Sequence, residues 1–299
     1  MKMSRFHPAK SLLLLSAALL FAAAPARATL LFAGVDLGAA GRTTQWAMFA
    51  LSGGITISDT SSQLVTQTVT STDPGGATIG AAGGGSITLS GTAKVVGTGY
   101  IRSGGVLRKS GAATITGGIQ PQNPVNDALT NQVVTDATAA TGQANGLANN
   151  ETNISRTVIG SWDSLTTVNQ NHSLSLTDTA GASNCVLHLS DFILSGGATF
   201  TLTGSADTTY VINVSGTFSL LGGKIVLTGG LQPENVLFNI TGSGTDVTLS
   251  SAAYFRGFLL APDRKVNLSA ASTLEGTLIA GKINVSGASR IKKPTYISP

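Results

Sequence analysis

Residues 256–291 read RGFLLAPDRKVNLSAASTLEGTLIAGKINVSGASRI, and this stretch nearly repeats itself. The segment GFLLAPDRKVNLSAAS, which begins at Gly257, is followed by GTLIAGKINVSGAS, which begins at Gly276. Each copy holds an apolar run, a run in which polar and apolar residues alternate, and a corner of small residues. Such alternation, interrupted by small residues, is typical of short β-strands joined by tight turns.

The same three-part unit recurs upstream, from residue 186 onward. Its first runs are VLHL, YVIN, VLFN, FLLA and TLIA, and they start 24, 26, 22 and 19 residues apart. A period near 20 residues with three short strands indicates a solenoid, in which stacked turns bury a core that no single turn can bury. Residues 86–118 contain similar short runs and small-residue turns, so we expect further coils there, continuous with the C-terminal ones.

The runs also predict which side of the solenoid is covered. VNLS and INVS alternate and leave one face in water, whereas YVI, VLF and FLLA are apolar on both faces and need a cover. One long helix is expected over residues 123–148, with Pro124 near its start, and it is the natural cover. We therefore expect a mostly β fold: an irregular right-handed β-solenoid with three short strands per coil and one long α-helix packed alongside.

The first 28 residues have the pattern of a secretory signal peptide: a basic start, a short apolar run, and Ala26-Arg27-Ala28 before the expected cleavage. We expect residues 29–299 to form a single β-solenoid domain. It would comprise N-terminal coils in 29–121, the flanking helix in 122–150, and a connector with the C-terminal coils in 151–299. The apolar run of the leader is short for a membrane span, and no integral span is expected in the mature chain.

Charge and cysteine content narrow the classes of partner. The leader holds four of the 18 Lys and Arg residues and none of the 14 Asp and Glu residues, so the remaining chain is formally neutral. A chain with no excess of positive charge is not expected to bind nucleic acid. Cys185 is the one cysteine, so an exported chain would have no internal disulfide, and we expect Cys185 to be buried.

Several segments together resemble a known family. They are AMFALSGGITIS, SITLSGTAKVVG, the VNDAL helix, DFILSGGATFTLTG, YVINVSGTFSL, GGLQPENVLFNITG and the repeat from Gly257. They are similar to the bacterial choice-of-anchor A adhesin-like family and to its relatives with the ice-binding-protein-like β-solenoid. The resemblance implies an extracellular surface or matrix protein without catalytic residues. The end RIKKPTYISP shows no sortase-type motif, so we expect secretion or passive retention rather than covalent anchoring.

Catalytic and metal sites are not expected. Asp263, Arg264 and Lys265 form the densest charge cluster of the repeat, but no carboxylate at a matching coil position completes an acid–base pair, which predicts a solvated turn. His172 and His188 have no Cys or His at metal-ligand spacing. We therefore expect no catalytic, cofactor-binding or metal residues, and no cofactor.

Asparagines mark the candidate polar face. Asn213, Asn239, Asn267 and Asn284 each begin an Asn-x-Ser/Thr tripeptide. They recur because the strand recurs, which favours a stacked ladder or an exposed polar face over glycosylation. The candidate face therefore comprises Asn213, Asn239, Asn267, Ser269, Asn284 and Ser286.

Threonines offer a second candidate. Thr199, Thr201 and Thr203 alternate in TFTLT, as do threonines in residues 66–72, and such rows on a flat rigid face can order water and match an ice lattice. The positions equivalent to 199, 201 and 203 in the next coil are Lys224, Val226 and Thr228, which interrupts the row. The β-propensity of threonine accounts for its enrichment without ice.

Three functions remain. The first is a secreted or cell-surface, non-enzymatic, adhesin-like or extracellular-matrix protein, whose rigid polar face binds glycan, matrix or other surface proteins through many weak contacts. The alternative is an ice-binding, antifreeze-type protein. A second alternative is a polysaccharide-active β-helix enzyme.

Overall fold

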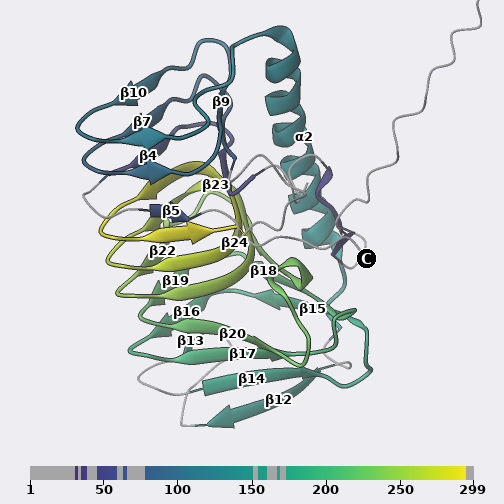
Figure 1. Cartoon of the computed structure of the whole chain (residues 1–299). Coiled ribbons are helices and arrows are strands. Elements are labelled where there is room, and N and C mark those ends of the chain that lie inside the picture. Colours follow the sequence, from purple (N-terminus) through teal and green to yellow (C-terminus); the bar gives the residue numbers. More distant parts are fainter. Residues whose placement is uncertain are drawn as a thin grey trace, which may run out of the picture.

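The fold is a stack of three-sided coils with one helix along a side, as Figure 1 shows. It was obtained as a computed structural model, which describes residues 31–32, 35–38, 46–58, 63–65, 78–150, 154–159, 167–168 and 173–293. Almost all strand pairs are parallel and join one coil to the next. The predicted class, a β-solenoid with three short strands per coil and one long flanking helix, is confirmed.

Each side of the stack is a parallel sheet, which we name by what covers or lines it. The helix face consists of β15 (Asn184–Leu189), β18 (Thr209–Val214), β21 (Val236–Ile240), the middles of β23 (Tyr254–Leu268) and β24 (Thr273–Val285), β3 (Met48–Ala50), β6 (Ile79–Ala81) and β9 (Gly99–Ile101). The second face consists of β13 (Thr167–Val168), β16 (Phe192–Ser195), β19 (Phe218–Leu221), β22 (Val247–Ser250), the ends of β23 and β24, β4 (Ile55–Ile57), β7 (Ile87–Leu89) and β10 (Leu107–Lys109).

The third face completes the coil. It consists of β14 (Ser173–Asp178), β17 (Thr199–Thr203), β20 (Lys224–Thr228), the starts of β23 and β24, β25 (Arg290–Lys292), β5 (Gln63–Val65), β8 (Lys94–Val95) and β11 (Thr114–Ile115). At one end of the stack β12 (Ile154–Ile159) pairs antiparallel with β14. A short hairpin of β1 (Leu31–Phe32) and β2 (Val35–Asp36) lies apart from this sheet.

The order of coils in the stack differs from their order in the chain. The last C-terminal coil, formed by β24 and β25, pairs in parallel with β3, β4 and β5 of the N-terminal half. The predicted continuity of the two halves is therefore correct. The chain must then travel from the top of the stack in Figure 1 back to its lower end, and α2 (Pro124–Gly146) does this. Its 23 residues span about 34 Å, or about seven coils.

The helix begins as the sequence predicts. The Asn123 side chain accepts the backbone N–H of Asn126, and Pro124 occupies the first turn. Its buried stripe is mostly small: Val133, Ala137, Ala140 and Ala144 lie against an outer apolar cluster of the helix face. This cluster includes Trp46, Phe49, Val211, Leu237, Phe258 and Ile279. Small residues let the helix approach the sheet closely, so the apolar runs of the helix face are covered.

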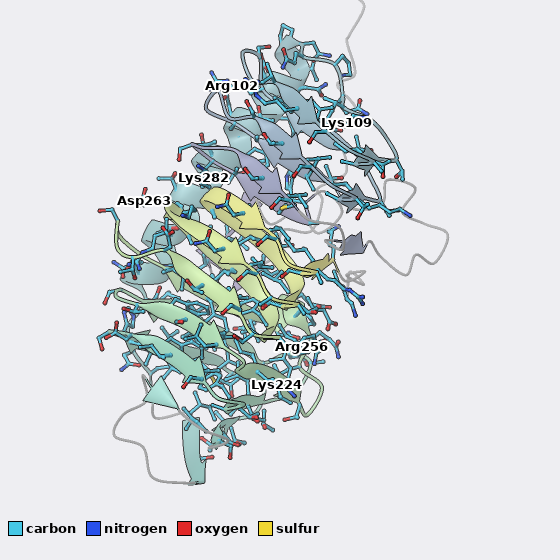
Figure 2. All side chains as sticks on the ribbon, turned by 90° about the vertical axis from the view of Figure 1, so that its left-hand side faces the viewer. Arg102, Lys109, Lys224, Arg256, Asp263 and Lys282 are labelled. Atoms are coloured by element: carbon cyan, nitrogen blue, oxygen red, sulfur yellow. The ribbon has the colours of Figure 1, made fainter. Side chains whose placement is uncertain are left out.

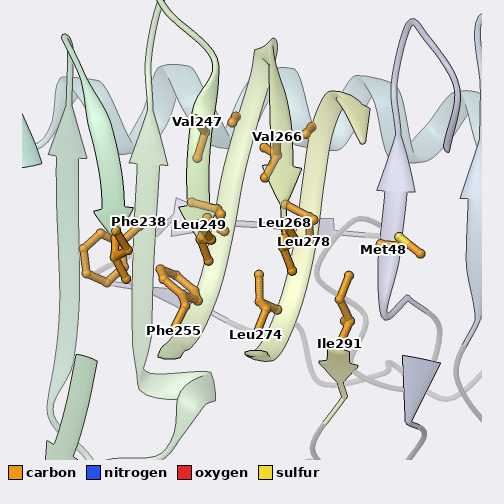
Figure 3. Packing of buried hydrophobic residues seen from close by; sticks show 14 of the residues in the cluster. Met48, Phe238, Val247, Leu249, Phe255, Val266, Leu268, Leu274, Leu278 and Ile291 are labelled. Carbon is orange, nitrogen blue, oxygen red and sulfur yellow. The ribbon is translucent and has the colours of Figure 1, made fainter. Parts of the chain in front are cut away.

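A continuous apolar core fills the interior of the coils. Alternate residues of every strand point inward, so Phe255, Leu274 and Ile291 align in three successive coils. Figure 3 shows these side chains stacked in the interior. Phe192, Phe218 and Phe238 stack in the lower coils with ring centroids 5.3–5.7 Å apart. Cys185 is buried in this core, as predicted.

Small residues at the corner after the second face have a conformational reason. Ser251, Ala252, Ala270, Ala271 and Ala288 all have positive φ between 50° and 61°. Left-handed backbone is costly for bulky side chains, so only small residues are suited to two such positions in succession. The repeated SAAS and SGAS segments are therefore turns, each of which carries the chain from the second face to the third.

Candidate functional site: an ordered polar face

Five consecutive coils carry the same tetrapeptide pattern on the second face. The segments are VTLS (247–250), VNLS (266–269), INVS (283–286), ITIS (55–58) and ITLS (87–90). In each, the first and third side chains are buried and the second and fourth point outward. The outward pair is a Thr or Asn followed by a Ser in every coil.

The register aligns these outward residues in two straight columns. One column is Thr248, Asn267, Asn284, Thr56 and Thr88. The other is Ser250, Ser269, Ser286, Ser58 and Ser90, because each of the last four donates its N–H to the coil before it. We call these ten residues the Ser-Thr-Asn face. Coils lie about 4.8 Å apart and alternate strand residues about 6.7 Å apart, which sets the two repeats of this array.

Hydrogen bonds between neighbouring coils hold part of this array. Asn284 Nδ2 donates to Asn267 Oδ1 over 3.2 Å, and Asn267 Nδ2 donates to Asp246 Oδ2 over 3.0 Å. Asp246 also pairs with Lys265 at 2.5 Å, and this contact lowers the pKa of the Asp246 carboxyl. The amide groups are thus oriented by their neighbours, which reduces the entropy they would lose on binding a surface.

The array has clear limits along the stack. Toward the lower coils the Thr/Asn column continues to Ser219 and then to Ile193, while the Ser column meets Leu221, whose side chain is 41% exposed. Toward the upper end, the next residue in the Thr/Asn column is Arg108. Figure 2 shows Asp263 and Lys282 at one margin of this side of the molecule and Arg256 and Lys224 at the other. Charged groups therefore border the array.

Asn213 and Asn239 require a correction. The sequence analysis grouped them with Asn267 and Asn284, but they lie on the helix face and are 3% and 0% exposed. Asn239 Nδ2 donates to Asn213 Oδ1 over 2.7 Å and to the Thr141 carbonyl over 3.2 Å. Asn213 Nδ2 donates to the Ala144 carbonyl over 2.8 Å. They form a ladder, but a buried one that satisfies carbonyls of α2.

His188 continues this ladder by one coil. Its register partner is Asn213, and its Nε2 lies 2.7 Å from the Leu147 carbonyl. The Ala144 carbonyl also accepts the Leu147 N–H, and the strand side chains provide further donors at this end of α2, where carbonyls run out of partners within the helix. The helix is therefore held by apolar packing from Val133 to Ala144 and, at its C-terminal end, also by polar groups.

The threonine row lies on the third face, on β17. Thr199, Thr201 and Thr203 pair with Lys224, Val226 and Thr228 in the next coil, as predicted. Beyond β20 this face becomes charged: Tyr254 donates to Glu275, and Arg256 lies 3.5 Å from the same carboxylate. Burial and this bond raise the pKa of Tyr254 to about 12. The ordered hydroxyl rows are thus confined to one end of the third face. The threonines expected at residues 66–72 lie outside the described residues.

The corner at Asp263, Arg264 and Lys265 is also corrected. Relative to the next coil this corner holds a two-residue bulge, because Ala261 pairs with Ala280 and Lys265 with Lys282. However, Arg264 is 3% exposed and does not lie in solvent. Its guanidinium donates to five carbonyls, those of Ser215, Gly216, Thr241, Gly242 and Thr245. The extra residues turn Arg264 inward, where it ties together the corners of neighbouring coils.

The N-terminal half of the Ser-Thr-Asn face was not predicted from the sequence. Thr56, Ser58, Thr88 and Ser90 belong to ITIS and ITLS, which match VNLS and INVS in pattern. That shared pattern was the available signal. The pattern also distinguishes the buried Asn213 and Asn239 from the open Asn267 and Asn284. The residues around the first two, in YVINV and VLFNI, are apolar, whereas VNLS and INVS alternate.

We also searched the described part of the chain for a metal site, a membrane-spanning helix and a cavity. No group of three or more His, Cys, Asp and Glu residues suited to a metal ion occurs there. Among the same residues, no helix is long and apolar enough to cross a membrane. A cavity of about 680 Å³ lies between α2 and the corners that carry Leu51, Gly242 and Pro262, with Asp263 as its charged lining residue. His172 is outside the described residues.

Known proteins resemble this chain in part of their sequence and in fold. An ice-binding protein of Flammulina populicola is 35% identical over 103 residues, and one of Leucosporidium sp. (strain AY30) is 37% identical over 81 residues. These matches cover 34% and 27% of this chain and 38% and 30% of those proteins. The solved structure of an ice-binding protein from an Arctic yeast shares the fold, with a TM-score of 0.56 at 18% identity over 91% of this chain and 98% of that one.

A family model covers most of the chain. The family described as "Putative Ice-binding-like adhesive domain" matches residues 39–291, and this description names ice binding and adhesion rather than a reaction. The chain therefore belongs to this non-enzymatic family of ice-binding-like adhesive domains.

Proposed function

We propose that this protein binds ice through the Ser-Thr-Asn face. The observation that supports this most is the array of two columns over five coils, in register and with fixed repeats. Ice presents a periodic lattice of oxygen atoms, so a surface recognises it by many weak contacts at regular spacing. The short side chains are carried by a parallel sheet on a packed core, so little conformational freedom is lost on binding.

The sharpest test places a bulky side chain on the face. Thr88→Tyr should project from the array, hold the face away from a flat lattice and abolish most ice-recrystallisation inhibition and thermal hysteresis. Thr201→Tyr is the matched control, because Thr201 is also a half-buried, outward threonine in mid-strand, but on the third face. Thr201→Tyr should retain activity. Wild-type activity no greater than that of albumin, or equal losses in both variants, would refute the proposal.

Adhesion is the second candidate, supported by the family description. The same rigid face would then contact a glycan or a neighbouring surface protein through many weak hydrogen bonds. Glycan-array and cell-attachment measurements on the folded chain distinguish the two functions. Attachment that is lost in Thr88→Tyr, without any ice activity in the wild type, would favour adhesion as the role of this face.

We also infer that the protein acts outside the cell. The support is the leader pattern of residues 1–28. Fractionation of the producing cells followed by N-terminal sequencing tests this inference. The expected product is found in the medium or at the surface and begins near Thr29. A cytoplasmic product that keeps residue 1 would contradict it.

A further inference from the structure

The formal neutrality of the chain after its leader conceals a separation of charge along the stack. The upper coils of Figure 1 are formed by residues 276–293, 46–58, 63–65 and 78–122. Their described parts contain eight Lys and Arg residues and no Asp or Glu: Lys94, Arg102, Arg108, Lys109, Lys282, Arg290, Lys292 and Lys293. The lower coils, residues 173–250, contain five acids and one Lys or Arg: Asp178, Asp191, Asp207, Glu234 and Asp246, with Lys224.

Six of these bases are exposed, and five of them lie on the second and third faces of the upper coils: Lys94, Arg108, Lys109, Arg290 and Lys292, which we call the basic end. Within the described residues, none of the five forms an ion pair. Glu275 is the register neighbour of Lys292, but it is engaged by Tyr254 and Arg256. Asp127 of α2 approaches the same end, and it accepts the N–H of Ser103, beside Arg102. The basic end therefore keeps its positive potential.

The placement of these bases indicates the shape of a partner. Arg290 and Lys94 lie on the third face, two coils apart, which is about 10 Å. Arg108 and Lys109 lie on β10, at the end of the second face. Figure 2 shows Lys109 at the opposite margin of the top coils from Arg102. A small anion reaches only one or two of these side chains, whereas a chain with repeated negative charges can contact them in succession around the end.

Three observations select the chemical class of this polyanion. The aromatic side chains of the described upper coils, Trp46, Phe49 and Tyr100, pack in the cluster beneath α2, so no stacking platform for bases is available there. The basic end extends over two sides of a prism, which does not suit a planar lipid surface. A second copy of this chain is a less suitable partner. Asp178 and Asp191, at its lower end, already accept hydrogen bonds within their own chain.

We propose that the basic end binds an acidic polysaccharide, a flexible polymer with a carboxylate on many of its sugars. Such a polymer supplies the repeated charge without requiring stacking, a flat surface or a deep pocket. Three members of the basic end lie on the third face, and Arg108 and Lys109 lie on β10, just beyond the end of the Ser-Thr-Asn face. Both surfaces can therefore be occupied together, which would tether the protein to a matrix while the ordered face contacts ice.

The test uses the folded chain and alginate as the probe, with neutral dextran as its uncharged counterpart. We expect binding to alginate at low salt, none to dextran, and marked weakening at about 0.15 M salt, where charges are screened beyond about 8 Å. Lys94→Gln with Lys109→Gln should weaken alginate binding about threefold to tenfold, as the loss of two exposed ion pairs implies. Lys224→Gln with Lys265→Gln removes the same charge elsewhere and should change it less than about twofold.

Several outcomes would overturn the proposal. They are an absence of alginate binding at low salt, equal loss in both double variants, tighter binding to duplex DNA or to anionic vesicles than to alginate, and self-association at low salt in place of polymer binding. Ice-recrystallisation inhibition is measured on the same samples and should be unchanged in Lys94→Gln with Lys109→Gln. Failure of ice binding and failure of polysaccharide binding are therefore distinguishable.

Discussion

Asn239 and Asn284 begin the same kind of tripeptide, yet one lies beneath the helix and the other on the open face. Asn239 is fully buried, donates to Asn213 and to a helix carbonyl, and holds two elements together. Asn284 is half-exposed and donates to Asn267 in a row that water can reach. The difference shows that a repeated polar residue in a solenoid stabilises the fold on a covered side and forms a binding surface on an open one.

Arg264 is a second buried polar residue of the repeat, and its substitution should have the largest effect on stability. Arg264→Met keeps the aliphatic stem but removes the donors of five carbonyls, and we expect a loss of at least about 3 kcal/mol in the free energy of unfolding. Urea denaturation measures it. Lys265→Met, at the half-buried neighbour that pairs with Asp246, should cost no more than about 1 kcal/mol. An Arg264→Met protein as stable as Lys265→Met would show that water replaces the guanidinium without cost.

Asn239→Ala tests the same rule at the helix. The change leaves Asn213 Oδ1 and the Thr141 carbonyl without this donor, and we expect a loss of about 2 kcal/mol in the free energy of unfolding. Hydrogen exchange at residues 141–147 should quicken, because the end of α2 is released. Asn284→Ala is the matched control and should leave both measurements nearly unchanged. Similar losses in the two variants would remove the distinction between the buried and the open asparagine.

Double-mutant cycles sharpen the comparison further. We expect a coupling energy of about 1 kcal/mol between Asn213 and Asn239, whose amide groups are 2.7 Å apart in a buried site. For Asn267 and Asn284, whose bond is 3.2 Å long and open to solvent, we expect less than about 0.3 kcal/mol. Equal coupling in both pairs would mean that the coil spacing, rather than burial, sets the strength of the ladder.

The smallest expected effect on stability is on the open face. Asn267→Ala together with Asn284→Ala should change the free energy of unfolding by no more than about 0.5 kcal/mol. The same double variant should lower ice-recrystallisation inhibition, because two adjacent members of the array lose their hydrogen-bonding groups. Asn239→Ala, measured where it is folded, should keep its activity. Loss of activity in Asn239→Ala but not in the double variant would show that the Ser-Thr-Asn face is not the ice contact.

Much of the fold follows from local pattern. The apolar runs on both faces of YVI and VLF predict a covered side, and the alternation in VNLS and INVS predicts an open one. The N-cap and the small stripe of α2 are likewise local features. Part of the site was accessible in the same way, because Asn267, Ser269, Asn284 and Ser286 alternate with buried residues. Arg264 was not, since nothing in PDRK shows that a two-residue bulge turns its guanidinium toward carbonyls from earlier coils.

The sequence by itself determined the three-strand period, the open and covered runs, the helix and its start, because each depends on contacts between near neighbours. The tertiary structure decided three further features. It determined which asparagines the helix covers. It also created the junction of β24 with β4, which aligns Thr56 and Thr88 with Asn284, and it separated basic from acidic coils. These features depend on the order in which distant segments stack, and in this protein that order differs from the order of the chain.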